Sequence, residues 1–459
     1  MQRLTLLFTV CVAFVILSLR SATADIIGLQ AGAKGEINVP EALLPELDET
    51  IVPKLKPLMP LFANNDYLAF KEQYTKLLQE TDTLPSVEVF WAKLLVVTNR
   101  VGDAIKVLED YVRDHQDDAE VYTTLGILAA RTGRFTDAWL HFLYAQRLLD
   151  RDSFPKSRLK YVLPTFVEAR AVVAEARKQW TEADQMYNKL MSLKPKDFSV
   201  KWRYGRSLIL AGNLSKGHQI MTEACESDEK LPRATLAVAQ LLADTTEWVK
   251  KKENSEAVEE WFKRAISEKE NDDKAWTSYF KWLVLSDRSP DVKTKFDALP
   301  DEVKKARDVA LIRSVAARYL NENSVAESLL TPLHQEKPDD LEVADQLALV
   351  LIESSDEAKR GRALQLAERN FRAASELEQV AATAAWVQLQ LGSSDIADKI
   401  LTQLAARGPL SPQTTYYVAE LLRRNGKDLD SKRLLKAAVD AVGVFPQRAK
   451  ARESLASKE

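Results

Sequence analysis

Cysteine, glycine and proline are all scarce in this sequence, and each shortage excludes a class of structure. The 459 residues include 2 cysteines, too few for a small scaffold held by disulfides. Glycine numbers 14 and proline 17, and because both residues break helices, their scarcity favours a helical chain. Hydrophobic residues make up 46%, which is enough to bury a core and argues against intrinsic disorder.

An excess of either charge is also missing. The 64 basic residues nearly balance the 67 acidic ones. Proteins that bind nucleic acid or anionic membranes usually carry a basic surplus. The sequence therefore predicts no nucleic-acid partner.

Clusters of catalytic or metal-binding residues are absent as well. The four histidines are His115, His141, His218 and His334, and none belongs to a zinc-binding pattern or lies near a cysteine pair. The sequence has no phosphate-binding glycine loop and no G-x-S-x-G motif. Acidic pairs such as Asp117-Asp118 and Asp339-Asp340 lie where helices begin, and they are interpreted as N-caps. We therefore predict a protein that is not an enzyme and that has no cofactor and no metal site.

Residues 1–24 have the features of an export signal. Arg3 precedes a mostly apolar run from Leu4 to Leu19, and Ala22-Thr23-Ala24 has the small-x-small pattern that precedes a cleavage site. We expect a secretory signal peptide cleaved before Asp25, which implies a periplasmic or secreted protein. An uncleaved inner-membrane anchor is the alternative, and only then would the protein be bound to a membrane.

Cleavage of that signal would remove Cys11 and leave Cys225 as the remaining cysteine. A single cysteine forms no internal disulfide. Cys225 follows Ala224 on a predicted helix, so we interpret it as a small filler residue, with a reactive thiol as the alternative.

What the sequence does contain is a repeat with a period of 34 residues. The spacing separates Ala104 from Ala138 and Leu108 from Phe142. The same interval recurs in two other stretches, for example from Ala171 to Gly205 and from Gly392 to Gly426. Three stretches that share one period indicate an array of similar structural units.

Each unit has the pattern of a helical hairpin. In the stretch around residues 121–145, small residues at two fixed places allow two helices to approach, and a large aromatic residue fills the space beside them. The packing residues of this unit are Tyr122, Leu125, Gly126, Ala138, Phe142 and Ala145.

These residues resemble the signature of the tetratricopeptide repeat family, and the prolines that close several units, such as Pro195, Pro338 and Pro409, strengthen the resemblance. It implies an all-α fold, a right-handed α-solenoid of stacked helix-turn-helix repeats. We expect about ten helical hairpins over residues 61–445. Residues 25–60 are rich in proline and are predicted to be an extended lead-in that packs on the first hairpin. Residues 446–459 form either a capping helix or a frayed tail.

Three stretches depart from the period, and one of them has about six extra residues between Ala239 and Ala257. About eleven extra residues lie between Leu149 and Val162, and they form either a loop or a lengthened helix. The unit at 273–306 matches worst, because Pro290 lies where its second helix should run.

The resemblance also implies where partners bind. In this family the first helix of each hairpin lines a concave groove, and arginine and aromatic residues there are typical interface anchors. Transferring this register gives the predicted binding residues, which are Lys93, Trp202, Arg206, Lys281, Arg318, Trp386, Tyr416 and Arg423. Tryptophan at helical spacing is also a common core residue, so a core position is the alternative for Trp202 and Trp386.

The leading hypothesis is an exported scaffold or adaptor protein that binds a peptide or a partner helix in this groove. The alternative is a membrane-tethered structural arm of an envelope secretion or polysaccharide assembly machine, which requires that the N-terminal segment stays uncleaved.

Overall fold

A computed structural model describes residues 46–244, 252–441 and 445–456 of the chain. The regular elements in these ranges are all helices. The chain divides into two compact units, with the boundary between Ala234 and Thr235. The predicted signal peptide lies outside the described residues.

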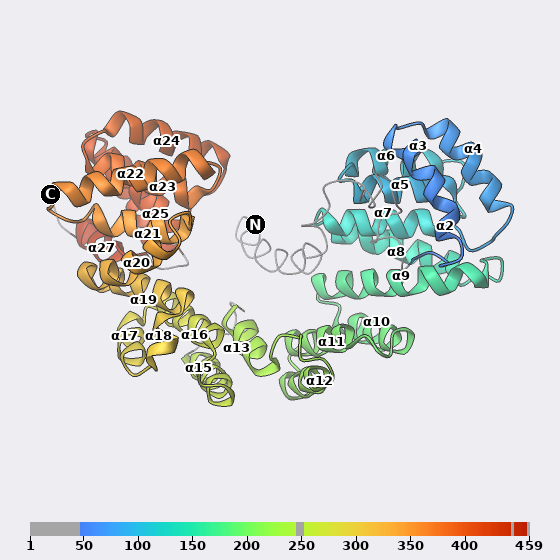
Figure 1. Cartoon of the computed structure of the whole chain (residues 1–459), viewed down its shortest axis with the longest axis horizontal. Helices are drawn as coiled ribbons and strands as arrows, with labels where there is room; N and C mark the ends of the chain where they lie inside the picture. Colours follow the sequence, from blue (N-terminus) through green and yellow to red (C-terminus); the bar gives the residue numbers. More distant parts are fainter. Residues whose placement is uncertain (1–45, 245–251, 442–444, 457–459) are drawn as a thin grey trace. The chain divides into compact units, whose positions relative to one another are not determined.

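The first unit consists of helices that pack in successive pairs (Figure 1). A short N-terminal group contains α2 (Val52–Leu55), the 3-10 helix η2 (Lys56–Leu58), α3 (Met59–Ala63) and α4 (Tyr67–Leu78). Four hairpins follow, formed by α5 (Val87–Val97) and α6 (Val101–Val112), α7 (Ala119–Arg131) and α8 (Phe135–Leu149), α9 (Lys156–Ala176) and α10 (Trp180–Leu193), and α11 (Phe198–Leu210) and α12 (Leu214–Ser227).

The second unit repeats the same arrangement. Its first helix is α13 (Ala234–Asp244), whose first residue is the last one of the first unit. The next helices are α15 (Lys252–Glu268), α16 (Asp273–Leu285), α17 (Ser289–Asp297) and α18 (Asp301–Lys305). Four hairpins follow, formed by α19 (Arg307–Tyr319) and α20 (Asn323–Glu336), α21 (Leu341–Leu351) and α22 (Glu357–Ala374), α23 (Glu378–Gln390) and α24 (Ser394–Arg407), and α25 (Pro412–Arg424) and α26 (Asp428–Asp440). Helix α27 (Arg448–Ala456) packs against α26. The predicted class of helical-hairpin solenoid is confirmed.

The hairpins close where the 34-residue pattern places small residues. A Cβ atom on Gly126 would lie 2.5 Å from Cε1 of Phe142, which is fully buried on the facing helix. A Cβ atom on Gly205 would lie 2.6 Å from the carbonyl oxygen of Gly217. Because real Cβ contacts are longer than this, these helices approach each other only when these positions carry no side chain.

The turn inside most hairpins contains one residue with positive φ. Glycine occupies that position at Gly133 and Gly212, and Asn99 and Asn321 occupy it elsewhere. Glycine and asparagine tolerate this left-handed conformation better than other residues do. At the other end of the hairpins, Asp118 accepts hydrogen bonds from the backbone N–H groups of Glu120 and Val121, so the predicted N-cap is confirmed there.

The extra residues between 149 and 162 lengthen a helix. Helix α9 spans 21 residues and begins directly after Pro155. Proline fits directly before a helix because it has no backbone N–H group. The N–H groups at the start of a helix have no acceptor within the helix, so no hydrogen bond is lost.

The prediction of an extended lead-in is wrong for residues 52–60. Short helices form there, and Pro53, Pro57 and Pro60 lie in their first turns, where proline is tolerated. The expected packing of the lead-in on the first hairpin is confirmed for its described residues. Its apolar side chains recur at helical spacing and are buried against α5, and they are Leu47, Ile51, Leu55, Leu58 and Phe62.

The irregular unit at 273–306 has a divided second helix. Helix α17 begins with Pro290 in its first turn, and a separate short helix, α18, follows it. At the C-terminal end, Phe445 and Ala451 are buried, so the segment around α27 covers the last hairpin. Among the described residues, no helix combines the length and the apolarity needed to cross a membrane.

Candidate protein-binding face

The first helices of successive hairpins contact each other directly in both units. In the first unit α5 contacts α7 and α7 contacts α9, and in the second unit α21 contacts α23 and α23 contacts α25. We call the surface formed by α5, α7 and α9 the first-helix face of the first unit. It corresponds to the groove that the sequence resemblance predicts.

Lys93 on α5 lies on this face but is not free. Its Nζ atom lies 2.5 Å from Oε2 of Glu46, which belongs to the lead-in, and 3.3 Å from Oε2 of Glu120 on α7. Only 15% of the Lys93 side chain is exposed. The prediction of Lys93 as an exposed groove residue is therefore wrong for this conformation, because a segment of the same chain covers it.

Arg158 on α9 completes this group of charges. Its Nε and Nη2 atoms donate to the two carboxylate oxygens of Glu120 at 2.7 and 2.8 Å. Its Nη1 atom donates to the main-chain carbonyls of Glu46 and Thr83. The Arg158 and Glu120 side chains are only 3% and 5% exposed. Two cations and two anions thus balance one another inside the face.

The pKa shifts of Glu120 and Lys93 favour the charged forms of these two side chains. Burial raises the pKa of Glu120, but Lys93 and Arg158 outweigh it and hold that pKa below its usual range. Burial lowers the pKa of Lys93, and Glu46 and Glu120 together raise it above its usual value. Each charge is therefore held by its opposite partners.

Further along the first unit, α11 presents two predicted residues with partners of their own. Trp202 is partly exposed, and its Nε1 atom donates to the carbonyl of Pro232 at 2.9 Å. Arg206 lies 3.3 Å from Glu175 on α9. Both side chains reach the surface, and each is held by a contact with another part of the chain.

In the second unit, Trp386 occupies the core position that was the alternative for it, and the prediction of an exposed Tyr416 is wrong. Trp386 is 4% exposed and stacks on Tyr417 with ring centroids 4.4 Å apart. Tyr416 is also buried and packs against Phe445. The reason is that α23 is surrounded by α21, α22, α24 and α25, so almost every residue of this helix is buried.

Arg318 is likewise misplaced by the sequence prediction, because it is buried on α19. Its Nη1 atom donates to Oε1 of Gln346 at 2.6 Å. Lys281 and Arg423 are exposed as expected. Arg423 forms an ion pair with Glu420 on its own helix at 3.0 Å.

A buried acid in the second unit was missed by sequence reasoning. Asp345 on α21 accepts hydrogen bonds at Oδ2 from Thr383 (3.0 Å) and from Gln379 (3.2 Å), both on α23. Burial raises its pKa to about 7, against the smaller opposing effects of these hydrogen bonds and of Arg318. Asp345 lies among apolar residues at helical spacing, and this position could have indicated from the sequence that it is buried.

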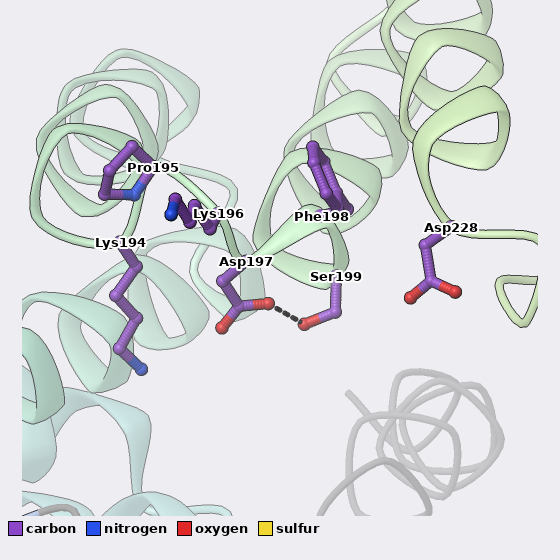
Figure 2. A pocket seen from close by; sticks show the side chains of 7 residues that line it. All are labelled: Lys194, Pro195, Lys196, Asp197, Phe198, Ser199 and Asp228. Atoms are coloured by element: carbon purple, nitrogen blue, oxygen red, sulfur yellow. Dashed lines mark hydrogen bonds between the residues drawn. The ribbon is translucent and has the colours of Figure 1, made fainter.

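An open pocket of about 610 Å³ lies at the turn between α10 and α11 (Figure 2). Lys194, Lys196 and Phe198 line it, and Asp197 accepts a hydrogen bond from Ser199 beside them. Asp197 also caps α11. Asp197 therefore stabilises the turn and the start of α11, and the lining residues do not form a cluster of catalytic type.

Cys225 is partly buried, and its thiol donates to the carbonyl of Pro232. Burial raises its pKa, which disfavours the reactive thiolate and favours the filler interpretation. Within the ranges that the structure describes, no group of three or more His, Cys, Asp or Glu residues is placed to hold a metal ion.

Comparison with known proteins agrees with this architecture. Residues 91–154, which run from α5 to the end of the turn after α8, match the tetratricopeptide repeat family model. Together with the paired helices, this match makes the fold a solenoid of the tetratricopeptide type. Among curated proteins, none matches the chain.

Several solved structures are similar at low identity. Yeast Tom70 is 13% identical, with a TM-score of 0.35, over 89% of this chain and 95% of that one. A human IFIT1 dimer with m7Gppp-AAAA is 13% identical, with a TM-score of 0.41, over 77% and 85%. The P58(IPK) TPR domain is 12% identical, with a TM-score of 0.25, over 85% and 100%.

Proposed function

We propose that this chain is an exported protein-interaction scaffold that holds an extended peptide or a partner helix against its first helices. The observation that carries the proposal is the lead-in segment on the first-helix face of the first unit. There, Lys93 and Arg158 bind both a carboxylate and a main-chain carbonyl of Glu46. Binding both a side chain and a main-chain carbonyl of one segment is how a peptide-binding surface works.

The pairing of the charged residues on the first-helix face supports the same proposal. The carboxylates on this face are paired with cations or serve as helix caps. The tetratricopeptide-type fold is generally non-enzymatic, and it generally binds other proteins. We therefore infer that the partner is a protein and not a nucleic acid.

A photo-crosslinking experiment tests the proposal. A photoreactive residue replaces Lys281, which is exposed on the first helix α16, and in a matched variant it replaces Lys399, which is exposed on the second helix α24. We expect covalent protein adducts from position 281 and few from position 399 when the protein is irradiated in extracts of its native cells. Equal labelling at both positions, or no protein adduct at position 281, contradicts binding on the first helices.

Export is the other part of the proposal, and it rests on residues 1–24. N-terminal sequencing of the native protein tests it. A mature chain that starts at Asp25 supports a periplasmic or secreted protein. A chain that retains Met1 in a membrane fraction favours an anchored protein instead.

A further inference from the structure

The first-helix face of the first unit requires an acidic group from outside its own three helices. Lys93, Arg158 and Glu120 carry two positive charges and one negative charge, and Arg158 and Glu120 are almost completely buried. Removing one partner from such a buried group leaves an uncompensated charge, which is strongly unfavourable. Glu46 supplies the missing negative charge at 2.5 Å from Lys93.

The neighbouring contacts extend this complementarity along the segment. Leu47 is buried in the core. The next residue, Asp48, accepts hydrogen bonds from Thr50 of its own segment and lies near Tyr161 and Lys160 on α9. The segment thus places the acid Glu46 against cations, the aliphatic Leu47 in the core, and the acid Asp48 near Lys160.

Three of the receiving side chains, Arg158, Lys160 and Tyr161, lie in the stretch that breaks the 34-residue period. A hairpin of standard length has no helical turns at this place. The added turns of α9 therefore build the site.

We propose that this face is a receptor site for an acid–aliphatic–acid segment, and that residues 46–51 are a resident occupant which a partner of the same chemistry displaces. The proposal rests on the scaffold function proposed above and names its ligand class. The resident segment has a high effective concentration because it is covalently attached, so it competes with any partner. Removing the Glu46 charge weakens the binding of the resident segment and makes the site available to a partner.

The test uses the full chain and a synthetic peptide of residues 46–55 with both ends blocked and a fluorescent label. The variant Glu46→Gln is compared with the natural chain and with Glu49→Gln, because Glu49 is exposed and belongs to the same segment. We expect Glu46→Gln to bind the peptide at least tenfold more tightly than the natural chain, and Glu49→Gln to bind as the natural chain does. A peptide that carries glutamine at the Glu46 position should bind at least tenfold more weakly.

A folded Glu46→Gln protein that binds the peptide no better than the natural chain overturns the proposal. Hydrogen exchange on the natural chain gives a second test that needs no variant. Excess peptide should accelerate exchange of the amides of residues 46–51, and unchanged exchange in millimolar peptide also overturns it. The two proposals fail separately, because adducts at position 281 would still support the scaffold function if the peptide did not bind.

Discussion

At the scale of single residues, the distance between α11 and α12 depends on the absence of two methyl groups. A Cβ atom on Gly205 would meet the carbonyl oxygen of Gly217, and backbone atoms cannot move aside as a side chain can. We expect Gly205→Ala to lower the free energy of unfolding by about 1–3 kcal/mol, the usual range for overpacking. Urea denaturation followed by circular dichroism measures this change.

A glycine in open space provides the control for that variant. Gly361 lies inside α22, and a Cβ atom there would meet nothing within 4 Å. Gly361→Ala should raise the free energy of unfolding by up to about 1 kcal/mol, because alanine favours the helix. If both variants change stability equally, helix propensity and not the approach of the helices explains the effect.

The buried acid Asp345 makes the stability of the second unit depend on pH. Its folded pKa of about 7 lies above its ordinary value of 3.8, so the unfolded chain loses this proton first as the pH rises. The stability contributed by the neutral acid is complete below pH 3.8 and is lost as the pH rises through 7. The difference corresponds to an effect on the order of 4 kcal/mol.

Asp345→Asn removes this titration, because asparagine stays neutral and its carbonyl oxygen still accepts from Thr383. We expect the variant to be more stable than the natural protein at pH 8, with an advantage that shrinks towards pH 5. Urea denaturation at several pH values measures the advantage. Glu353→Gln, at an exposed position in the same hairpin, is the control. A constant difference between Asp345→Asn and the natural chain from pH 5 to 8 would show that Asp345 does not titrate there.

At the scale of elements, a buried ion pair attaches α9 to α7. Arg158 holds Glu120 on α7 with two hydrogen bonds, and both side chains are buried. Arg158→Ala leaves Glu120 without its main partner, and breaking such a pair costs about 3–5 kcal/mol. Thermal unfolding followed by circular dichroism should show a clear loss of stability.

The matched control is Arg100→Ala, which removes an exposed ion pair with Asp103. Exposed pairs contribute about 0–1 kcal/mol. A loss for Arg158→Ala no larger than the loss for Arg100→Ala would contradict the role given to the buried pair.

Much of this element structure could be predicted from the sequence because local spacing determines it. The 34-residue interval predicts where hairpins repeat, and the pattern of small and large residues within one hairpin predicts that Gly126 contacts Phe142, as it does. Asp118 caps α7 because the chemistry of a cap involves residues only two or three positions apart. Helix caps and the packing within one hairpin depend on residues that lie close together in the sequence.

The binding residues could not be predicted because their exposure depends on distant parts of the chain. Trp386 lies on a first helix in the expected register, yet neighbouring helices bury it on all sides. Lys93 is covered by Glu46, which lies 47 positions away in the sequence. No periodic pattern links these two residues, and the prolines of the lead-in suggested an extended segment, with no indication of which of its side chains would contact Lys93.

At the scale of the whole molecule, the two compact units have separate hydrophobic clusters. Apolar residues of α5 and the lead-in form one cluster in the first unit, and α19 to α27 share another in the second. In repeat proteins each hairpin is stabilised mainly by its neighbours, so distant parts can unfold independently. We expect calorimetry to show more than one unfolding transition.

The residue variants identify these transitions. Gly205→Ala should lower the melting temperature of one transition, and Asp345→Asn at pH 8 should raise that of a different one. If either variant moved every transition by the same amount, the chain would unfold as one cooperative body.

The contact between Glu46 and Arg158 also has a consequence for the time course of synthesis. These residues are 112 positions apart, and the earlier one is made first. At ribosomal rates of about 5–20 residues per second, Glu46 waits roughly 6 to 20 s before Arg158 is joined to the chain. During this interval the apolar stripe that begins at Leu47 has only part of its final surroundings. The hydrogen bond between the lead-in and α9 can therefore form only after the lead-in has had time to pack on α5.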